Sequence, residues 1–291
     1  MTTAAAALRA LIEQPLPPTL PLVLDPLSAK LAEQAGFEGI YLGGGTLGYM
    51  MTSTEAALPL TTMCHLATNI RAASPLPMVL DGQCGWGDPM HVDYTMRMAE
   101  AAGVAGIEIE DQLQPKRAHH HIGIEHLIPT HMMTEKIRIA REVRRDEDFV
   151  IVARTNACRG REGLDEALRR GEAFRAAGAD MLLLLPKTPE QARAIGERIE
   201  GPLFYMTPGG GLPSIGMTRE ELAKLGYRLV VDATTPFYAH YHALRRAYEA
   251  IARGEPDPTV NGSDYSKETE HVHRTIGLGR LLEIERRTVE N

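Results

Sequence analysis

The chain has 291 residues, with 31 Lys and Arg against 38 Asp and Glu, and a formal net charge of −7 at pH 7. This negative balance lacks the basic footprint of a nucleic-acid binder or of a protein that docks on anionic membranes. Hydrophobic residues make up 44% and charged residues 24%, which are ordinary values that exclude a collagen-like or disordered chain. The length allows two domains, yet α/β barrels reach about 250 residues as one domain.

The cysteines and the N-terminus indicate the compartment. Cys64, Cys84 and Cys158 are an odd and sparse set, which fits a reducing compartment better than a disulfide framework. No apolar run reaches the roughly 18 residues of a membrane span. Residues 1–18 interrupt their apolar stretch with Arg9 and Glu13, so they predict a short helix ended by prolines rather than a signal peptide. We therefore expect a soluble, cytoplasmic protein that does not bind membranes.

Short apolar runs alternate with helix-like segments along most of the chain. The strand-like runs are 21–25, 39–44, 77–81, 105–111, 149–154, 180–185, 202–207 and 228–233. The helix-like segments between them are 28–36, 60–73, 89–103, 134–145, 164–178, 189–200 and 218–226. Nearly continuous apolar runs suit strands that are buried on both faces of a parallel sheet. Eight such repeats predict a (β/α)8 TIM barrel rather than an open sheet.

A helical segment at 237–254, a polar linker at 255–264 and a second helical stretch at 271–291 follow the last predicted strand. A barrel needs no further helix there. We expect residues 1–255 to form the barrel domain and 256–291 to form a linker and helical tail. This tail either covers the barrel or packs on another subunit.

Polar residues follow the apolar runs, mostly where a strand ends. They are Asp25, Gly43, Gly44, Gly45, Asp81, Glu110, Asp111, Arg154, Lys187, Thr207 and Asp232. Active sites of α/β barrels lie at the carboxyl ends of the strands. The carboxylates of Asp81 and Glu110 suit a hard cation such as Mg²⁺, and Arg154 offers a planar fork for a substrate carboxylate. The glycines let backbone N–H groups approach an anion. Alternatively, any one of these acids caps a helix or forms a buried ion pair.

The loop 110–129 is long and contains Lys116, Arg117 and three consecutive histidines, His119, His120 and His121. Long loops in compact domains are usually lids or binding loops. Three adjacent histidines cannot all face one zinc ion, so zinc is the weaker interpretation. In the stronger one, a histidine transfers a proton while Lys116 and Arg117 bind an anionic substrate. A solvated loop without a catalytic role stays open.

Five segments, DPLSAKLAEQAGFEGIYLGGG, VLDGQCGWGDP, AGVAGIEIEDQLQPKRAHH, DFVIVARTNA and AGADMLLLL, resemble in order those of the isocitrate lyase/phosphoenolpyruvate mutase superfamily. The resemblance covers about residues 20–250. It is strongest to short bacterial members such as methylisocitrate lyase, dimethylmalate lyase and oxaloacetate decarboxylase. It implies a (β/α)8 barrel, Mg²⁺ (or Mn²⁺) dependence, an enolate of a 2-oxo acid and a homotetramer. In that tetramer, a dimer of helix-swapped dimers, the last barrel helix is exchanged between subunits.

By position, the resemblance assigns Asp81 and Glu110 to the metal. It assigns Tyr41, Gly44 and Gly45, with Gly43 beside them, to the 2-oxo acid end of the substrate, and Arg154 to substrate oxygens. Lys116, Arg117 and His120 match the mobile catalytic loop. Asp25 matches the polar end of the first strand, and Trp86 matches an aromatic residue that lines the pocket.

The departures from the family pattern concern the substrate. Gln83 replaces a second metal-associated acid, Ala118 replaces the proton-transferring cysteine of the lyases, and Leu185 and Pro208 replace two glutamates. We therefore expect a substrate other than isocitrate or methylisocitrate, and His119 or His120 as the replacement proton carrier.

The sequence thus predicts a Mg²⁺-dependent carbon–carbon lyase that cleaves a small 2-hydroxy (or 2-oxo) carboxylic acid. The alternatives are an oxaloacetate-type decarboxylase or hydrolase, a phosphonopyruvate-type enzyme, and a catalytically silent barrel with a binding role.

Overall fold

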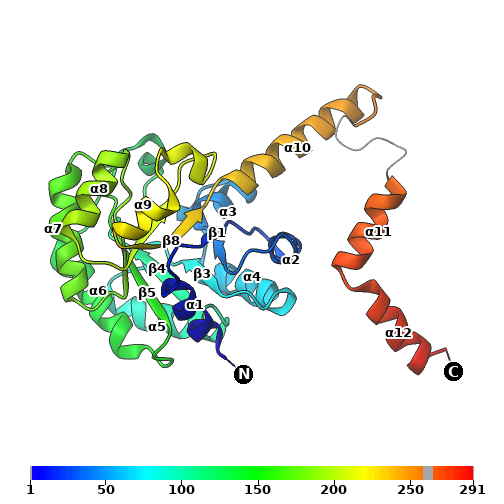
Figure 1. The fold of residues 1–291 in the computed structure, drawn as a ribbon, viewed down its shortest axis with the longest axis horizontal. Helices are drawn as coiled ribbons and strands as arrows, with labels where there is room; N and C mark the ends of the chain where they lie inside the picture. The colour runs from blue at the N-terminus through cyan, green and yellow to red at the C-terminus, as the bar shows by residue number, and fades with distance from the viewer. Residues whose placement is uncertain (1, 258–264, 291) are drawn as a thin grey trace. The chain divides into compact units, whose positions relative to one another are not determined.

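The computed structural model describes residues 2–257 and 265–290. The chain divides into two compact units, Met1–Thr235 and Pro236–Asn291. The first unit is a barrel of alternating strands and helices (Figure 1).

Eight parallel strands form one sheet in the order β1-β8-β7-β6-β5-β4-β3-β2. A parallel bridge between Leu22 and Tyr41 joins the two ends of this order and brings the sheet nearly to closure. The strands are β1 Thr19–Pro21, β2 Ile40–Leu42, β3 Met78–Asp81, β4 Gly106–Glu110, β5 Val150–Arg154, β6 Met181–Leu183, β7 Leu203–Met206 and β8 Tyr227–Asp232. The predicted (β/α)8 barrel is confirmed, although β1 lies earlier than the predicted run 21–25.

Helices surround these strands in Figure 1. They are α1 Ala4–Ile12, α2 Pro26–Gln34, α3 Gly44–Met50, α4 Leu60–Ala73, α5 Pro89–Ala101, α6 Thr130–Val143, α7 Gly163–Ala176, α8 Pro189–Arg198 and α9 Arg219–Lys224. Three short 3-10 helices lie in the connecting loops: η1 Glu55–Ala57, η2 Ala118–Ile122 and η3 Leu212–Ile215. The residues at the N-termini of several α-helices favour helix formation. Asp25 and Thr218 form capping boxes at α2 and α9, and prolines occupy the first turn of α2, α5 and α8.

The strands are buried on both faces, as their apolar composition predicts. All residues of β2, β3, β4, β5 and β6 are buried. Strand β4 differs in that it buries two charged side chains: Glu108 and Glu110 are both 1% exposed. Residues two apart in a strand face the same side, so β4 presents two carboxylates to one side of the sheet.

The second unit contains α10 Thr235–Ala252, α11 Tyr265–Thr275 and α12 Leu278–Thr288. Residues 258–264, which fall in the predicted polar linker, lie outside the described residues. Large apolar side chains of this unit are exposed, among them Tyr238, Tyr241, Tyr248 and Ile251. Within the described ranges, no helix has the length and apolar character needed to cross a membrane.

Candidate active site

Two acids of β4 and the arginine of β5 form a buried ion-pair cluster. Arg154 Nη1 lies 2.7 Å from Glu108 Oε1, and its Nε lies 3.2 Å from Glu110 Oε2. The Tyr41 hydroxyl on β2 donates to Glu108 Oε2 at 3.1 Å. Strands β4 and β5 pair in register at Glu110 and Arg154, so backbone pairing brings these opposite charges together at the carboxyl ends of the strands.

The turn after β5 braces the same cluster. Asn156 Nδ2 donates to Glu110 Oε2 at 2.7 Å, and Arg154 Nη2 donates to Asn156 Oδ1 at 2.9 Å. Asp111 holds this turn, since its carboxylate accepts from Thr155 Oγ1 at 2.6 Å and from the Asn156 backbone N–H at 3.1 Å. Asp111 therefore positions the turn that carries Asn156.

Asp81 closes β3 next to the glycine segment after β2. Its Oδ2 accepts from the Gly44 N–H at 2.8 Å and its Oδ1 from the Gln83 N–H at 2.9 Å. A Cβ at Gly44 would lie 3.0 Å from Asp81 Oδ2, so this position favours glycine. The glycine segment, predicted to hold an anion, thus binds the Asp81 carboxylate. Gly45 has open space around its Cα instead.

Burial and charge set the ionisation of the acids. Burial acts to raise the pKa of Glu110, but the charges of Arg154 and Lys116 outweigh it and hold this pKa well below its usual value. Burial raises the pKa of Glu108 to about 7 against the opposing effect of Arg154. Burial also raises the pKa of Asp81. The site therefore combines one firmly ionised carboxylate with two that protonate more readily.

Lys116 reaches into this cluster from the loop after β4. Its Nζ lies 2.6 Å from Glu110 Oε1 and 2.9 Å from Glu55 Oε1, and its side chain is 5% exposed. Glu55 comes from the loop after β2 and is 2% exposed. Burial acts to lower the pKa of Lys116, but the two carboxylates outweigh it and raise this pKa. The ammonium group thus joins the two loops by a buried double ion pair.

The histidines of this loop have different surroundings. His120 Nδ1 lies 3.0 Å from Glu125 Oε2 and its Nε2 lies 4.0 Å from Glu55 Oε1. His121 contacts Glu55 at 2.9 Å, whereas His119 is exposed and lies 3.0 Å from His126. His120 is therefore the half-buried histidine held between two carboxylates.

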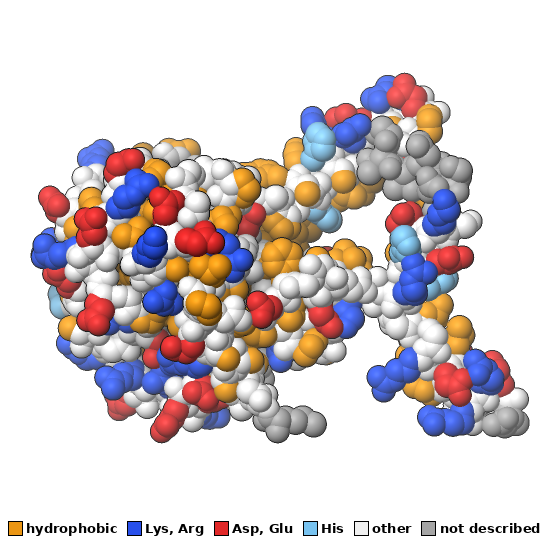
Figure 2. All heavy atoms as spheres, viewed as in Figure 1, with side chains coloured by type: hydrophobic (Ala, Val, Ile, Leu, Met, Phe, Trp, Pro, Cys, Tyr) orange, Lys and Arg blue, Asp and Glu red, His pale blue; other side chains and the backbone are white. Residues whose placement is uncertain are grey.

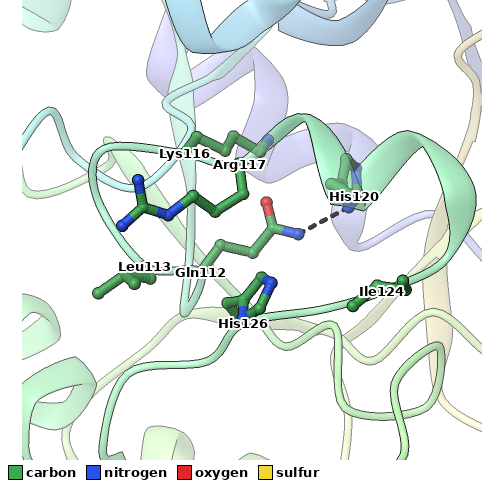
Figure 3. Close-up of a pocket in the computed structure, with 7 residues that line it drawn as sticks. All are labelled: Gln112, Leu113, Lys116, Arg117, His120, Ile124 and His126. Carbon is green, nitrogen blue, oxygen red and sulfur yellow. Dashed lines mark hydrogen bonds between the residues drawn. The ribbon is translucent and has the colours of Figure 1, made fainter.

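A small cavity lies beneath η2 (Figure 3). In the close-up, Gln112 and His120 point toward each other, and Gln112 Nε2 lies 2.6 Å from His120 Nδ1. The guanidinium group of Arg117 points away from His120, and Arg117 is exposed. The structure therefore directs Lys116 and His120 toward the acids but not Arg117.

The carboxylates of Asp81 and Glu110, rather than the amide of Gln83, are the type of ligand that a hard cation takes. Gln83 Nε2 is buried without a hydrogen-bond partner, and Gln83 adopts a strained φ of 48°. An orphaned amide N–H group is a donor, so it indicates a missing acceptor, such as a water or a substrate oxygen, rather than a cation. The described residues contain no group of three or more His, Cys, Asp or Glu that could hold a metal. The candidate ligands for a divalent cation are therefore the two carboxylates of Asp81 and Glu110, at the ends of β3 and β4.

Two other predicted site residues, Asp25 and Trp86, make hydrogen bonds to the backbone of neighbouring segments. Asp25 Oδ1 accepts from the Ser28 N–H at 2.7 Å and caps α2, because β1 ends four residues earlier than Asp25 and leaves this acid in a turn. Trp86 is half-buried and donates from Nε1 to the Leu58 carbonyl at 2.9 Å. Gly43 is the residue before α3 and makes no side-chain cap.

Four residues of this cluster and its loop were not predicted from the sequence: Glu108, Glu55, Glu125 and Asn156. Glu108 had a detectable signal, because it lies two residues before Glu110 in a strand and shares its face. Glu55 and Glu125 had none, since both lie in loops, and their contacts with Lys116 and His120 depend on tertiary structure.

Comparisons with known proteins identify the family of the chain. The family model for phosphoenolpyruvate phosphomutase matches residues 8–252. The 2,3-dimethylmalate lyase of Eubacterium barkeri is 32% identical, with 97% of this chain and 96% of that protein covered. The oxaloacetate decarboxylase of Pseudomonas putida GB-1 is 34% identical, with 82% of this chain and 81% of that protein covered.

Among solved structures, phosphonopyruvate hydrolase in complex with oxalate and Mg²⁺ superposes with a TM-score of 0.85. It is 29% identical, and 99% of each chain is covered. The chain therefore belongs to the phosphoenolpyruvate phosphomutase family, in the superfamily of isocitrate lyase and phosphoenolpyruvate mutase, and is an enzyme related to the lyases of that superfamily.

Proposed function

We propose that this enzyme is a Mg²⁺-dependent carbon–carbon lyase that cleaves a small 2-hydroxy (or 2-oxo) carboxylic acid through an enolate. The observation that carries the proposal is the buried cluster of Asp81, Glu110 and Arg154 at the carboxyl ends of β3, β4 and β5. Mg²⁺, when bound, would supply positive charge that stabilises the oxygen of the developing enolate.

Arg154 is suited to bind the substrate carboxylate. A guanidinium group has five N–H donors, and hydrogen bonds to Glu108 and Asn156 use one N–H on each Nη. One N–H on each Nη is left, and this pair matches the two oxygens of a carboxylate. Glu108 and Asn156 fix the plane of the guanidinium group, so Arg154 meets the substrate in one orientation.

His120 is the candidate proton carrier. Glu125 lies 3.0 Å from its Nδ1, which fixes the ring and leaves Nε2 facing the side of Glu55 and Lys116. Ala118 has no group to transfer a proton, and exposed His119 lies against His126. The buried Lys116 ion pairs hold the loop over the acids and help to exclude water.

The residues around the cluster argue against isocitrate and methylisocitrate as substrates. Leu185 is 1% exposed at the end of the β6 segment, and it and Pro208 occupy positions that carry glutamates in the resembling lyases. An apolar side chain there leaves no carboxylate to hydrogen-bond a substrate hydroxyl.

Calorimetry with Mg²⁺ and oxalate tests the proposal. Oxalate mimics the enolate of pyruvate, so we expect it to bind only when Mg²⁺ is present. Turnover on a panel of 2-hydroxy diacids, with pyruvate detected as product, then identifies the reaction. Absence of Mg²⁺-dependent oxalate binding would refute the proposal and favour a catalytically silent barrel.

A second candidate is decarboxylation or hydrolysis of a 2-oxo acid such as oxaloacetate. The loss of both acids at Leu185 and Pro208 favours it, and the oxaloacetate decarboxylase of P. putida is 34% identical. Release of CO₂ from oxaloacetate, without cleavage of any 2-hydroxy acid, would select this candidate over the lyase.

We also propose that the chain acts as a homotetramer, a dimer of helix-swapped dimers. Tyr238, Tyr241, Tyr248 and Ile251 of α10 are each 55% to 67% exposed, and Figure 2 shows apolar side chains on the second unit. Exposed apolar side chains at this density mark an interface. Sedimentation of the full chain as a monomer would exclude the tetramer.

A further inference from the structure

Gln83 carries a buried donor just after β3 that the proposed function does not use. The residue is 3% exposed, and its φ of 48° lies in the left-handed region. Its Nε2 atom makes no hydrogen bond to residues 2–257 or 265–290. Buried amide groups are nearly always hydrogen-bonded, and strained backbone is concentrated at functional sites. Both features indicate that this amide meets a ligand.

Backbone contacts fix Gln83 between the two candidate metal ligands. Its N–H group donates to Asp81 Oδ1 at 2.9 Å, and its carbonyl accepts from the Glu110 N–H at 2.8 Å. A Cβ at Gly44 would lie 3.4 Å from Gln83 Cγ and 3.0 Å from Asp81 Oδ2, so the side chain runs beside the glycine segment. The amide, two bonds beyond Cγ, therefore lies at the carboxyl ends of the strands, where a substrate binds in such barrels.

The acids of the cluster already have donors of their own. The oxygens of Asp81 accept from two backbone N–H groups, and those of Glu110 accept from Lys116 and Asn156. Gln83 Nε2 donates to neither acid, nor to any other group in the described part of the chain. The acceptor for this amide therefore comes from outside the chain.

The charge of the cluster favours an anionic acceptor. Asp81, Glu108 and Glu110 are all buried, and Gln83 places a neutral donor where the resembling family carries a further acid. A fourth carboxylate there would repel an anionic substrate. An amide N–H instead binds an oxygen of that anion, and a hydrogen bond to an ionised oxygen is stronger than one to a neutral acceptor.

We propose that Gln83 determines substrate specificity by donating its amide N–H to an anionic oxygen of the substrate, a carboxylate or enolate oxygen at the Asp81 end of the site. This inference rests on the proposed function and deepens it. An acid that turned a carbon atom toward Gln83 would leave the buried donor unpaired, so the enzyme discriminates against such an acid.

Calorimetric titration of oxalate into the full chain saturated with Mg²⁺ tests the inference. Gln83→Met keeps the length of the side chain and removes the donor. It should weaken oxalate binding about 10- to 100-fold, as expected for a hydrogen bond to a charged group, and leave the Kd for Mg²⁺ without oxalate within about 2-fold. Gln14→Met is the matched control, because Gln14 lies before β1 and donates to Glu38 at 3.1 Å, and it should change neither affinity.

Gln83→Glu separates the loss of the donor from damage to the site. It keeps the shape of glutamine and adds a carboxylate beside Asp81 and Glu110, so it should weaken oxalate binding and tighten Mg²⁺ binding. Damage to the site would weaken both.

Three results would overturn the inference. Unchanged oxalate affinity in Gln83→Met would show that water is the acceptor. Parallel losses of Mg²⁺ and oxalate affinity in both variants would make Gln83 a support of the metal site. If the wild type binds no oxalate with Mg²⁺, the proposed function fails and this inference fails with it, whereas the first two results leave the proposed function intact.

Discussion

Replacing Lys116 with methionine tests whether its ammonium group holds the loop after β4 against the site. Methionine keeps the apolar stem and removes the charge, which leaves Glu55 and Glu110 facing each other. Both carboxylates are nearly inaccessible, with side-chain exposures of 2% and 1%. Removing one partner of a buried ion pair costs about 3–5 kcal/mol.

Remaining contacts reduce this cost. Glu110 keeps Arg154 at 3.2 Å and Asn156 at 2.7 Å, and Glu55 keeps His121 at 2.9 Å. We therefore expect a loss of about 3 kcal/mol in the free energy of unfolding at pH 7.5, at the lower end of that range.

The pH dependence follows from the pKa shifts. Lys116 contributes to the lowered pKa values of both Glu55 and Glu110. A carboxyl group with a lowered pKa stabilises the fold above its unfolded value, near 4.3, and loses this contribution as the pH falls. Without Lys116 these acids protonate more readily, so the difference in stability between variant and wild type should shrink as the pH falls below about 4.3.

Urea unfolding in EDTA, followed by circular dichroism, measures the free energy of unfolding of variant and wild type and its dependence on pH. Hydrogen exchange of the segment 112–125 reports whether the loop has opened. Arg117→Met is the matched control, since Arg117 is the adjacent exposed cation, and it should change stability by less than about 0.5 kcal/mol. A loss below about 1 kcal/mol for Lys116→Met, with wild-type exchange in the loop, would refute the reasoning.

Three further predictions concern the acids and the histidines. Asp81→Asn should raise the Kd for Mg²⁺ at least about 10-fold in calorimetry, and an unchanged Kd would exclude Asp81 as the ligand. His120→Ala should lower kcat at least about 100-fold, whereas His119→Ala should change it little; equal effects would contradict the assignment. Burial raises the pKa of Glu108 to about 7, so the stability of the wild type should fall as the pH rises from 5 to 8. Glu108→Gln should flatten this decline in urea unfolding. An unchanged slope would argue against a protonated Glu108.

The barrel could be predicted from local pattern because burial on both faces requires continuous apolar strands. The runs at 77–81, 105–111 and 149–154 each contain the observed strand, β3, β4 or β5. In parallel strands the carboxyl ends meet at one edge, so Asp81, Glu110 and Arg154 could be placed together without knowledge of any contact. The first strand differs from its prediction, since β1 Thr19–Pro21 shares only residue 21 with the apolar run 21–25.

Only the tertiary structure distinguished acids with the same sequence context. Asp25 and Asp81 both follow apolar runs, yet Asp81 ends β3 while Asp25 lies beyond β1 and caps α2. The role of such an acid depends on where its strand stops, and hydrogen bonding to the neighbouring strand decides this. No periodicity in the sequence records it.

The sequence by itself determined the barrel and the meeting of Asp81, Glu110 and Arg154 at one edge of it, because strand burial and strand direction are local properties. The fold decided which charges meet. Glu55 and Lys116 come from different loops and pair at 2.9 Å, and Arg159, Lys187 and Pro208 line one cavity although they lie in loops after three different strands. Loop contacts depend on the three-dimensional path of the chain, so only the structure reveals them.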